Sequence, residues 1–295
     1  MPLRPGDLIL EPGEFRLLES LRLNPRKTTA GRVRGERLTR RKGISIEFAD
    51  FRDYVDGDDV RHLDWNVLAR MDSSVIRTYQ DEEDLSVHLL LDRSSSMSFG
   101  ELSKFEQAKR IAATLGYLAL GGRDALYPKA VGSRDNPMSA LRGKSSYLRY
   151  ASWISEQRPD GNIPLVESLK SFAGGKSRPG LAVIISDGLD PRAPEAVASV
   201  GGRGHEIMFV QILALEEIDP DIEGDLRLLD SETNSQVEIT ANSQAVREYR
   251  NALSRHCDSL AAATRRVGGR FVQINSRTSL EDFVKNGLKR GGWVA

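Results

Sequence analysis

The chain has 295 residues, of which 39% are hydrophobic and 28% charged; this suits one large folded domain, or a domain with an appendage, and excludes wholesale disorder. Its 42 basic and 42 acidic residues cancel, so no overall charge draws the protein to nucleic acid or to a membrane surface. The single cysteine excludes a disulfide framework and a cysteine-based zinc site, and it fits a reducing compartment.

The N-terminus and the apolar runs indicate the cellular location of the protein. Residues 1–15 carry charges where a signal peptide needs an apolar core. The longest apolar runs, residues 181–185 and 207–215, are far too short to cross a bilayer. We therefore expect a soluble, cytoplasmic protein without a membrane span.

Residues 1–80 form the first predicted segment, and charge dominates their composition. A basic stretch, 31–43, precedes an acidic one, 50–59, and neither is apolar enough to form a core by itself. We expect this segment to pack on a main domain, residues 81–295, through aromatic anchors and a network of ion pairs, because Arg holds carboxylates well. A docking surface for a partner is the functional alternative. The expected anchors are Phe48, Tyr54 and Trp65, and the expected network joins Arg40, Arg41, Arg52 and Arg61 to Glu47, Asp53, Asp58, Asp59 and Asp64.

In the main domain, short apolar runs alternate with long amphipathic ones, as expected for repeated strand–helix units. Three of the predicted strands are almost continuous runs of large apolar residues, which is typical of parallel strands covered on both faces. The pattern predicts an α/β fold, an open and mostly parallel Rossmann-like sheet with helices on both faces. The expected strands are residues 85–91, 125–129, 181–186, 206–215 and 270–274.

Two long helices and a hairpin are the clearest elements between these strands. One helix is expected to begin at Ser103, where Glu106 three residues later predicts a capping box. The other covers residues 243–269 and ends at Gly268, a suitable C-cap. A small hairpin, turning at Thr233–Ser235, is expected just before the second helix.

Polar side chains follow two of the buried strands, at the point where each strand ends. Asp92 ends one strand and Asp187 follows another, so both carboxylates are expected in one crevice beyond the carboxyl ends of the sheet. Ser94 and Ser96 alternate after Asp92 and add hydroxyl oxygens. A hard cation such as Mg²⁺ prefers about six oxygens, which is the chemistry that these residue types offer.

The same residues resemble the metal-ion-dependent adhesion site of von Willebrand factor A domains. Asp92, Ser94 and Ser96 match its Asp-x-Ser-x-Ser motif, and Asp187 matches the second aspartate of the family. The resemblance implies that these four residues hold Mg²⁺, whose open position accepts a carboxylate from a partner protein. The family also uses a threonine, and Ile163 stands at that place. Asn162 or Asp160 could substitute for it.

A second interpretation of the motif needs no metal. Asp and Ser satisfy free backbone N–H groups well, so Asp92 and Ser94 could simply cap the turn that follows the strand. Both interpretations stay open at this point, and the loss of the threonine at Ile163 also leaves open a metal-free scaffold.

A longer pattern upstream of the aspartate–serine motif is more specific than the motif itself. It comprises Arg40, Arg41, Gly43, Glu47, Phe48, Arg52, Tyr54, Gly57, Asp58, Asp59, Arg61, Asp64, Trp65, Ala69 and Arg70. With this pattern the chain resembles the family known as domain of unknown function fifty-eight, over roughly residues 32–290. The resemblance implies a bacterial or archaeal von Willebrand A-like domain that acts with a MoxR-type AAA+ ATPase, as an adaptor in complex assembly or metal-cofactor insertion. We therefore expect a protein-interaction module, with that ATPase and a client protein as partners.

Catalytic alternatives find weaker support in the sequence. A haloacid-dehalogenase phosphotransferase needs a second aspartate two residues after the first, and Ser94 stands there. The phosphate-loop pattern ending at Gly174–Ser177 has Lys170 in place of its first glycine. The basic stretch 31–43 lacks the aromatic residues that stack nucleic-acid bases. We expect no enzyme activity, and a metal-dependent phosphohydrolase using Asp92 is the alternative.

Overall fold

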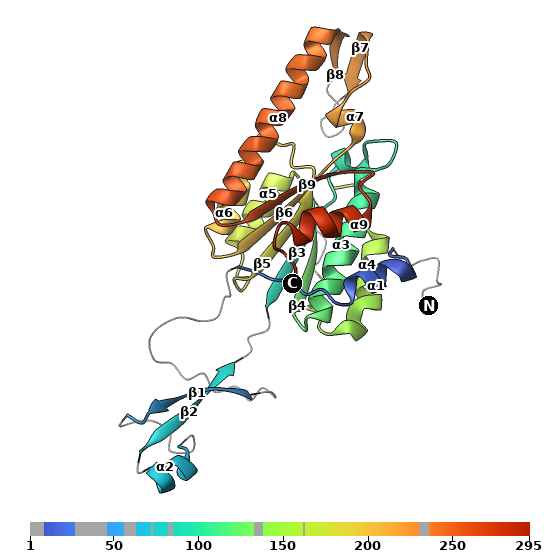
Figure 1. The fold of residues 1–295 in the computed structure, drawn as a ribbon. Helices are drawn as coiled ribbons and strands as arrows, with labels where there is room; N and C mark the ends of the chain where they lie inside the picture. The colour runs from blue at the N-terminus through green and yellow to red at the C-terminus, as the bar shows by residue number, and fades with distance from the viewer. Residues whose placement is uncertain are drawn as a thin grey trace. The chain divides into compact units, whose positions relative to one another are not determined.

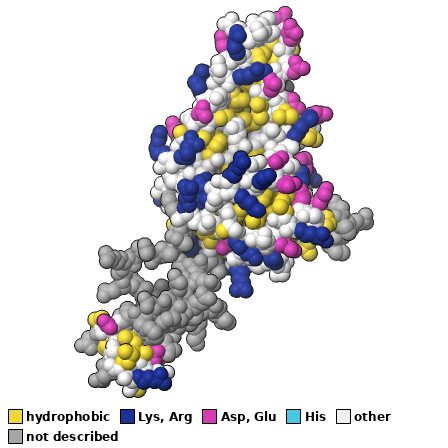
Figure 2. Space-filling model, viewed as in Figure 1, with side chains coloured by type: hydrophobic (Ala, Val, Ile, Leu, Met, Phe, Trp, Pro, Cys, Tyr) yellow, Lys and Arg dark blue, Asp and Glu magenta, His cyan; other side chains and the backbone are white. Residues whose placement is uncertain are grey.

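A computed structural model describes residues 9–26, 46–55, 63–71, 73–81, 85–132, 138–161, 163–229 and 236–295 (Figure 1). The chain divides into two compact units. The main unit comprises residues 1–29 and 85–295, and the smaller unit comprises residues 30–84. Over the described surface of the main unit that Figure 2 shows, basic and acidic side chains are interspersed, in keeping with the zero net charge.

The main unit is built on a five-stranded sheet in which all the neighbouring strands are parallel. This confirms the predicted α/β class and all five predicted strands. The fourth predicted strand ends at Leu213, two residues early, because Leu215 starts the short helix α7 (Leu215–Ile218). The order across the sheet is β4 (Ala125–Val131), β3 (Ser86–Asp92), β5 (Leu181–Ser186), β6 (Glu206–Leu213) and β9 (Arg270–Asn275).

Helices cover both faces of this sheet, and each face has its own apolar core (Figure 1). In β3 the buried side chains alternate: Leu89 and Leu91 join one core and Leu90 the other. This explains why three of the strands are almost continuous apolar runs and do not alternate apolar with polar residues. One face carries α1 (Pro12–Leu18), α3 (Lys104–Gly121), α4 (Tyr147–Glu156), α9 (Leu280–Asp282) and η5 (Phe283–Lys289), and the other carries α5 (Leu165–Gly174), α6 (Ala193–Gly201) and α8 (Ser243–Arg266).

The two predicted long helices are present, but their capping interactions differ in part from the predicted ones. Ser103 caps α3 and accepts a hydrogen bond from the Phe105 backbone at 3.2 Å. Glu106, predicted to complete a capping box, instead pairs with Lys109 at 2.7 Å, one turn along the helix. Asn242 caps α8 through two hydrogen bonds, to the backbone N–H groups of residues 244 and 245.

The predicted hairpin is formed by β7 (Gly224–Leu229) and β8 (Gln236–Ala241), which pair antiparallel. Its turn lies outside the described residues. The hairpin accompanies the amino-terminal half of α8, which continues past the sheet (Figure 1). The buried residues of α8 all lie between Cys257 and Thr264, so only its second half packs on the sheet.

The first described residues, 9–26, belong to the main unit. The sequence had predicted instead that all of residues 1–80 form a separate segment. Leu10 and Leu18 are buried in the core beside α3, and Glu14 pairs with Arg110 of that helix. Leu23 forms an antiparallel bridge with Val294 near the C-terminus. Apolar burial therefore places residues 9–26 with the sheet, and the charged segment is shorter than predicted.

The smaller unit contains β1 (Ile46–Asp53) and β2 (Val75–Asp81), paired antiparallel, and α2 (Trp65–Met71). Asp64 caps α2 by accepting from the Asn66 backbone N–H at 2.9 Å. Trp65 is 62% exposed, so it does not belong to a core. Packing of this unit on the main one stays a prediction. The described residues do not include Arg40, Arg41, Asp58, Asp59 and Arg61, nor the side chains of Glu47, Phe48 and Arg52.

Candidate functional site

The sheet changes direction at β3, and this fixes where a ligand site is expected. The chain runs from β3 to β4 on one side, then returns past β3 to β5 on the other. In such sheets the crevice beyond the carboxyl ends of the two diverging strands is the usual ligand site. Asp92 is the last residue of β3 and Asp187 directly follows β5, so the structure brings both predicted carboxylates to this place.

Asp92 is buried and both of its carboxylate oxygens accept hydrogen bonds. The Ser94 backbone N–H donates to Oδ1 at 2.9 Å, and the Ser186 hydroxyl donates to Oδ2 at 2.6 Å. Ser186 Oγ itself accepts from the Gly188 backbone at 2.9 Å. Burial, and then the negative charge of Asp187, raise the pKa of Asp92 to about 6.

Ser94 precedes the short helix η3 (Ser95–Ser98) and Ser96 lies within it, with the two hydroxyl oxygens 3.0 Å apart. A close backbone contact holds the chain before η3, because the Gly161 N–H donates to the Arg93 carbonyl at 2.7 Å. A Cβ atom at Gly161 would lie 2.8 Å from that carbonyl oxygen and 2.7 Å from the one of Gly132. Only glycine permits such an approach, so the loops after β3 and β4 and the loop before α5 pack as one layer.

Asp187 is paired with a lysine that the sequence analysis missed. Lys104 Nζ donates to Asp187 Oδ2 at 2.7 Å and to Glu217 Oε1 at 2.6 Å. The lysine side chain is 0% exposed. Burial alone would lower the pKa of Lys104, but the charges of Asp187 and Glu217 outweigh this and raise it, so the side chain is an ammonium.

A signal for Lys104 exists in the sequence. Lys104 precedes Ala108, Ile111 and Leu115 at helical spacing, on the face of α3 that is buried. A charged residue on an apolar face needs a partner, which the strand-end aspartates could have supplied. Glu217 gave no such signal, because it lies in α7 after another strand.

Among the described residues of the loop that carries Ile163, none supplies a free substitute for the threonine. The Ile163 N–H donates to the Gly132 carbonyl at 2.9 Å, and its side chain has no oxygen. The carboxylate of Asp160 pairs with the Arg93 guanidinium and is 64% exposed. Asn162 lies outside the described residues. Of the two suggested substitutes, Asp160 is thus occupied by Arg93.

Asp92, Ser94, Ser96, Asp187 and Glu217 are among the residues that line a pocket of about 770 Å³, here called the strand-end pocket. Asp92, Ser94 and Asp187 are its buried polar residues, here called its floor, whereas Phe99 and Tyr249, here called its rim, are 50% and 42% exposed. The Tyr249 hydroxyl donates to the Glu217 backbone carbonyl at 2.9 Å, which joins α8 to the pocket. The lining residues are Asp92, Ser94, Ser96, Phe99, Pro164, Leu165, Asp187, Leu189, Asp190, Pro191, Arg192, Glu217 and Tyr249.

The residues of the strand-end pocket do not fit a six-oxygen shell for Mg²⁺. The two serine hydroxyls are suitable neutral ligands, but Asp187 is already neutralised by Lys104, and Asp92 holds its hydrogen bonds with both oxygens. Ile163 offers no third hydroxyl. Among the described residues no cluster of three or more His, Cys, Asp or Glu side chains is placed to hold a metal ion.

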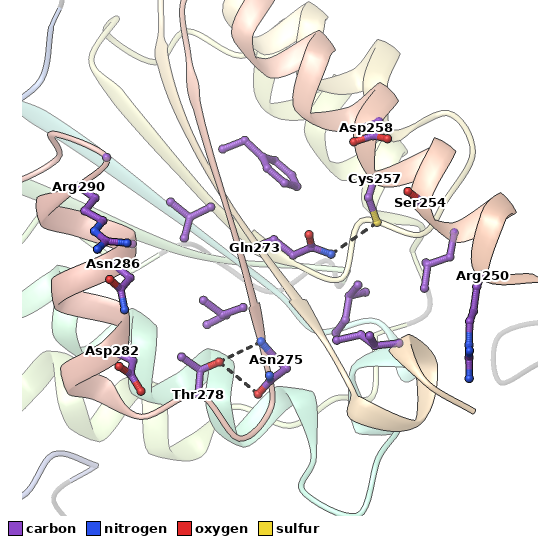
Figure 3. A pocket seen from close by; sticks show the side chains of 18 residues that line it. Arg250, Ser254, Cys257, Asp258, Gln273, Asn275, Thr278, Asp282, Asn286 and Arg290 are labelled. Atoms are coloured by element: carbon purple, nitrogen blue, oxygen red, sulfur yellow. Dashed lines mark hydrogen bonds between the residues drawn. The ribbon is translucent and has the colours of Figure 1, made fainter. Parts of the chain in front are cut away.

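A second pocket, of about 810 Å³, lies across β9 between α8 and η5 (Figure 3). Cys257 on α8 and Gln273 on β9 meet in it, with 3.8 Å between Sγ and Nε2. Burial raises the pKa of the Cys257 thiol, so the sulfur is protonated and a poor nucleophile. This pocket lacks the buried charges of the strand-end pocket, which is the better candidate site.

No helix in the described part of the chain is long and apolar enough to span a bilayer.

Comparison with known proteins places this chain among relatives without an assigned function. An uncharacterized protein of Mycobacterium tuberculosis, Rv1480, is 27% identical over 292 residues, covering 95% of this chain and 90% of its own length. The uncharacterized protein Mb1516 of Mycobacterium bovis matches with the same values, and MAV169 of Mycobacterium avium is 28% identical over 123 residues, 41% of this chain and 72% of its own.

Two solved structures are similar at low sequence identity. BatB from Bacteroides thetaiotaomicron has a TM-score of 0.44 and 15% identity, over 70% of this chain and 98% of its own. An aerotolerance-related membrane protein from Bacteroides fragilis has a TM-score of 0.44 and 14% identity over the same shares. The family described as "Protein of unknown function DUF58" matches residues 50–259, well over half of the sequence, and the chain belongs to this family.

Proposed function

We propose that this chain is a protein-interaction module that docks a partner protein in the strand-end pocket. The observation that carries the proposal is the pocket itself, at the switch point of the sheet, with a polar floor and a partly apolar rim. Exposed aromatic residues such as Phe99 and Tyr249 are enriched where proteins bind each other.

The partner follows from the family resemblance. It implies a MoxR-type AAA+ ATPase in the cytoplasm, and a client protein that the two handle together. The proposal assigns to this chain the role of an adaptor that recognises the client or the ATPase.

Binding suits the pocket better than catalysis. Asp92 is 1% exposed and both of its oxygens are engaged, which opposes its use as a nucleophile in a phosphohydrolase. Asp187 is paired with an ammonium and is not poised to transfer a proton. Turnover of a generic phosphate ester that disappears in Asp92→Asn would favour the phosphohydrolase alternative.

The docking proposal is tested with a rim substitution and a matched control. Phe99→Glu places a charge on the rim of the pocket, whereas Leu148→Glu makes the same change on α4, where the leucine is 58% exposed and not part of the pocket. Binding to the purified ATPase, and to candidate clients, is measured by calorimetry. We expect at least a tenfold loss for Phe99→Glu and little change for the control. Equal affinities for the two variants would refute docking in this pocket.

A further inference from the structure

We propose that the ammonium of Lys104 is the resident cation of the strand-end pocket and takes the place of a divalent ion at Asp187. Its consequence for binding, that a partner docks without divalent metal, rests on the proposed function. The cation itself is inferred from the geometry alone.

The position of the ammonium is fixed from several sides. Lys104 is the first residue of α3, and its Nζ lies 2.7 Å from Asp187 Oδ2 and 2.6 Å from Glu217 Oε1. Glu217 is held in turn, because its Oε2 accepts from the Ala214 backbone N–H at 2.8 Å. The ring centroid of Phe99 lies 5.9 Å from Nζ. The lysine is therefore a fixed, fully buried charge beneath two carboxylates that line the pocket, and not a mobile surface charge.

Burial makes this ammonium necessary. The side chain of Asp187 is 5% exposed and that of Glu217 is 12% exposed. Two carboxylates in such a place need a counter-charge, since an unpaired buried charge is costly. A metal ion usually supplies that charge in acidic sites, and here a side chain supplies it.

The same ammonium opposes a second cation. A divalent ion on Asp187 would share that carboxylate with Lys104, at a distance where like charges in a buried site repel strongly. The remaining oxygens offer little compensation, because Asp92 is engaged twice and Ile163 has replaced a hydroxyl ligand. The carboxylate of Asp187, which a metal would need, is thus already paired with an ammonium.

Removing the ammonium should create a metal site. In Lys104→Met the apolar stem of the side chain is largely kept, while Asp187 and Glu217 lose their counter-charge. Both carboxylates would then face the space that Nζ had occupied, with the hydroxyls of Ser94 and Ser96 in the same pocket. Such an oxygen-rich set suits Mg²⁺ or Mn²⁺.

Thermal unfolding with and without millimolar Mn²⁺ or Mg²⁺ tests the proposal. For the wild-type chain we expect a midpoint that metal leaves unchanged to within about 1 °C. For Lys104→Met we expect a lower midpoint in chelator that metal raises by several degrees, because a ligand that binds only the folded state stabilises it. Lys104→Met/Asp187→Asn should lose this response.

The proposal is overturned if metal raises the wild-type midpoint by several degrees, or if folded Lys104→Met gives no response. If Lys104→Met fails to fold, a measurement on the wild-type chain alone still tests the proposal. In a Mn²⁺ titration followed by electron paramagnetic resonance, we expect no site tighter than about 1 mM. A tighter site that disappears in Ser94→Ala/Ser96→Ala would contradict the resident cation.

A binding experiment separates this proposal from the proposed function. Nucleotide-free partner is titrated into the wild-type chain with chelator and then with millimolar Mg²⁺, and we expect equal affinities. Binding that requires Mg²⁺ would overturn the resident cation and leave docking intact. Absence of binding under both conditions would refute docking. The metal titrations would still test whether Lys104 takes the place of a divalent ion.

Discussion

The two ends of the parallel sheet bury different polar groups. At the amino end, the His88 and His205 rings meet with centroids 5.1 Å apart, and His88 Nε2 lies 2.8 Å from the Arg178 carbonyl oxygen. Burial lowers the pKa of both imidazoles, so they are neutral at pH 7. At the carboxyl end, Lys104 and Asp187 are buried as charges. The amino end also buries a charged pair, Glu206 and Arg270, 2.9 Å apart. The comparison teaches that the carboxyl end differs because its buried charges, such as Asp187, line the strand-end pocket, where a ligand can approach.

The largest expected effect on stability comes from removing the Lys104 charge at the carboxyl end of the sheet. Lys104→Met should lower the free energy of unfolding by about 3–5 kcal/mol in chelator, because it leaves two buried carboxylates uncompensated. Lys109→Met is the matched control one turn further along α3, since Lys109 pairs with the exposed Glu106. We expect a loss below about 1 kcal/mol for this control. Denaturant unfolding of both variants at pH 7.5 measures the difference, and similar losses would mean that the Lys104 pair is not special.

A smaller effect concerns pH at the amino end. Burial, and then the neighbouring His88, lower the pKa of His205 to about 4 from 6.5. A base with a depressed folded pKa binds fewer protons in the folded than in the unfolded state, so stability falls as the pH drops below 6.5. Between pH 7 and 5 this amounts to about 2 kcal/mol. Urea unfolding at the two pH values should show a loss that is smaller by this amount in His205→Gln, and an unchanged loss would place His205 in water.

The opposite sign is expected at the carboxyl end. Because the pKa of Asp92 is raised to about 6 from 3.8, the folded state binds more protons there than the unfolded state. Its contribution to stability therefore increases as the pH falls through 6, by about 1 kcal/mol between pH 7 and 5. Asp92→Asn should remove this gain when the same unfolding curves are compared with the wild type. If the variant and the wild type keep a constant difference across the range, Asp92 does not titrate there.

The smallest effect comes from restoring the family threonine. Ile163→Thr should change the free energy of unfolding by less than about 1 kcal/mol, because the residue is only partly buried. With Lys104 present we expect no metal response in thermal unfolding. In the Lys104→Met background the added hydroxyl should increase the response to Mg²⁺. A metal response of Ile163→Thr alone would show that the missing hydroxyl, and not the ammonium, is what keeps metal away.

The sequence predicted those parts of the fold and the site that depend on local patterns. Apolar runs, almost continuous in three strands and interrupted in the other two, predicted the five strands, and the position of Asp92 and Asp187 at strand ends predicted their proximity. The helical spacing of Lys104 signals a buried lysine that needs a partner, but the partners lie 83 and 113 residues away and no local pattern identifies them. The predicted domain boundary at residue 80 differs from the structure for a similar reason. The burial of Leu10 and Leu18 depends on contacts with the distant core beside α3, which the local sequence does not show.

The long helix α8 has a mechanical consequence for the strand-end pocket. Its projecting half carries Tyr249, whose hydroxyl holds the backbone of Glu217, and Glu217 holds Lys104. Tilting that half away from the sheet must either break the tyrosine contact or pull residue 217 off the ammonium. A load applied to the hairpin beside α8 would therefore reach the floor of the pocket through three consecutive hydrogen bonds, Tyr249 to Glu217, Lys104 to Glu217 and Lys104 to Asp187.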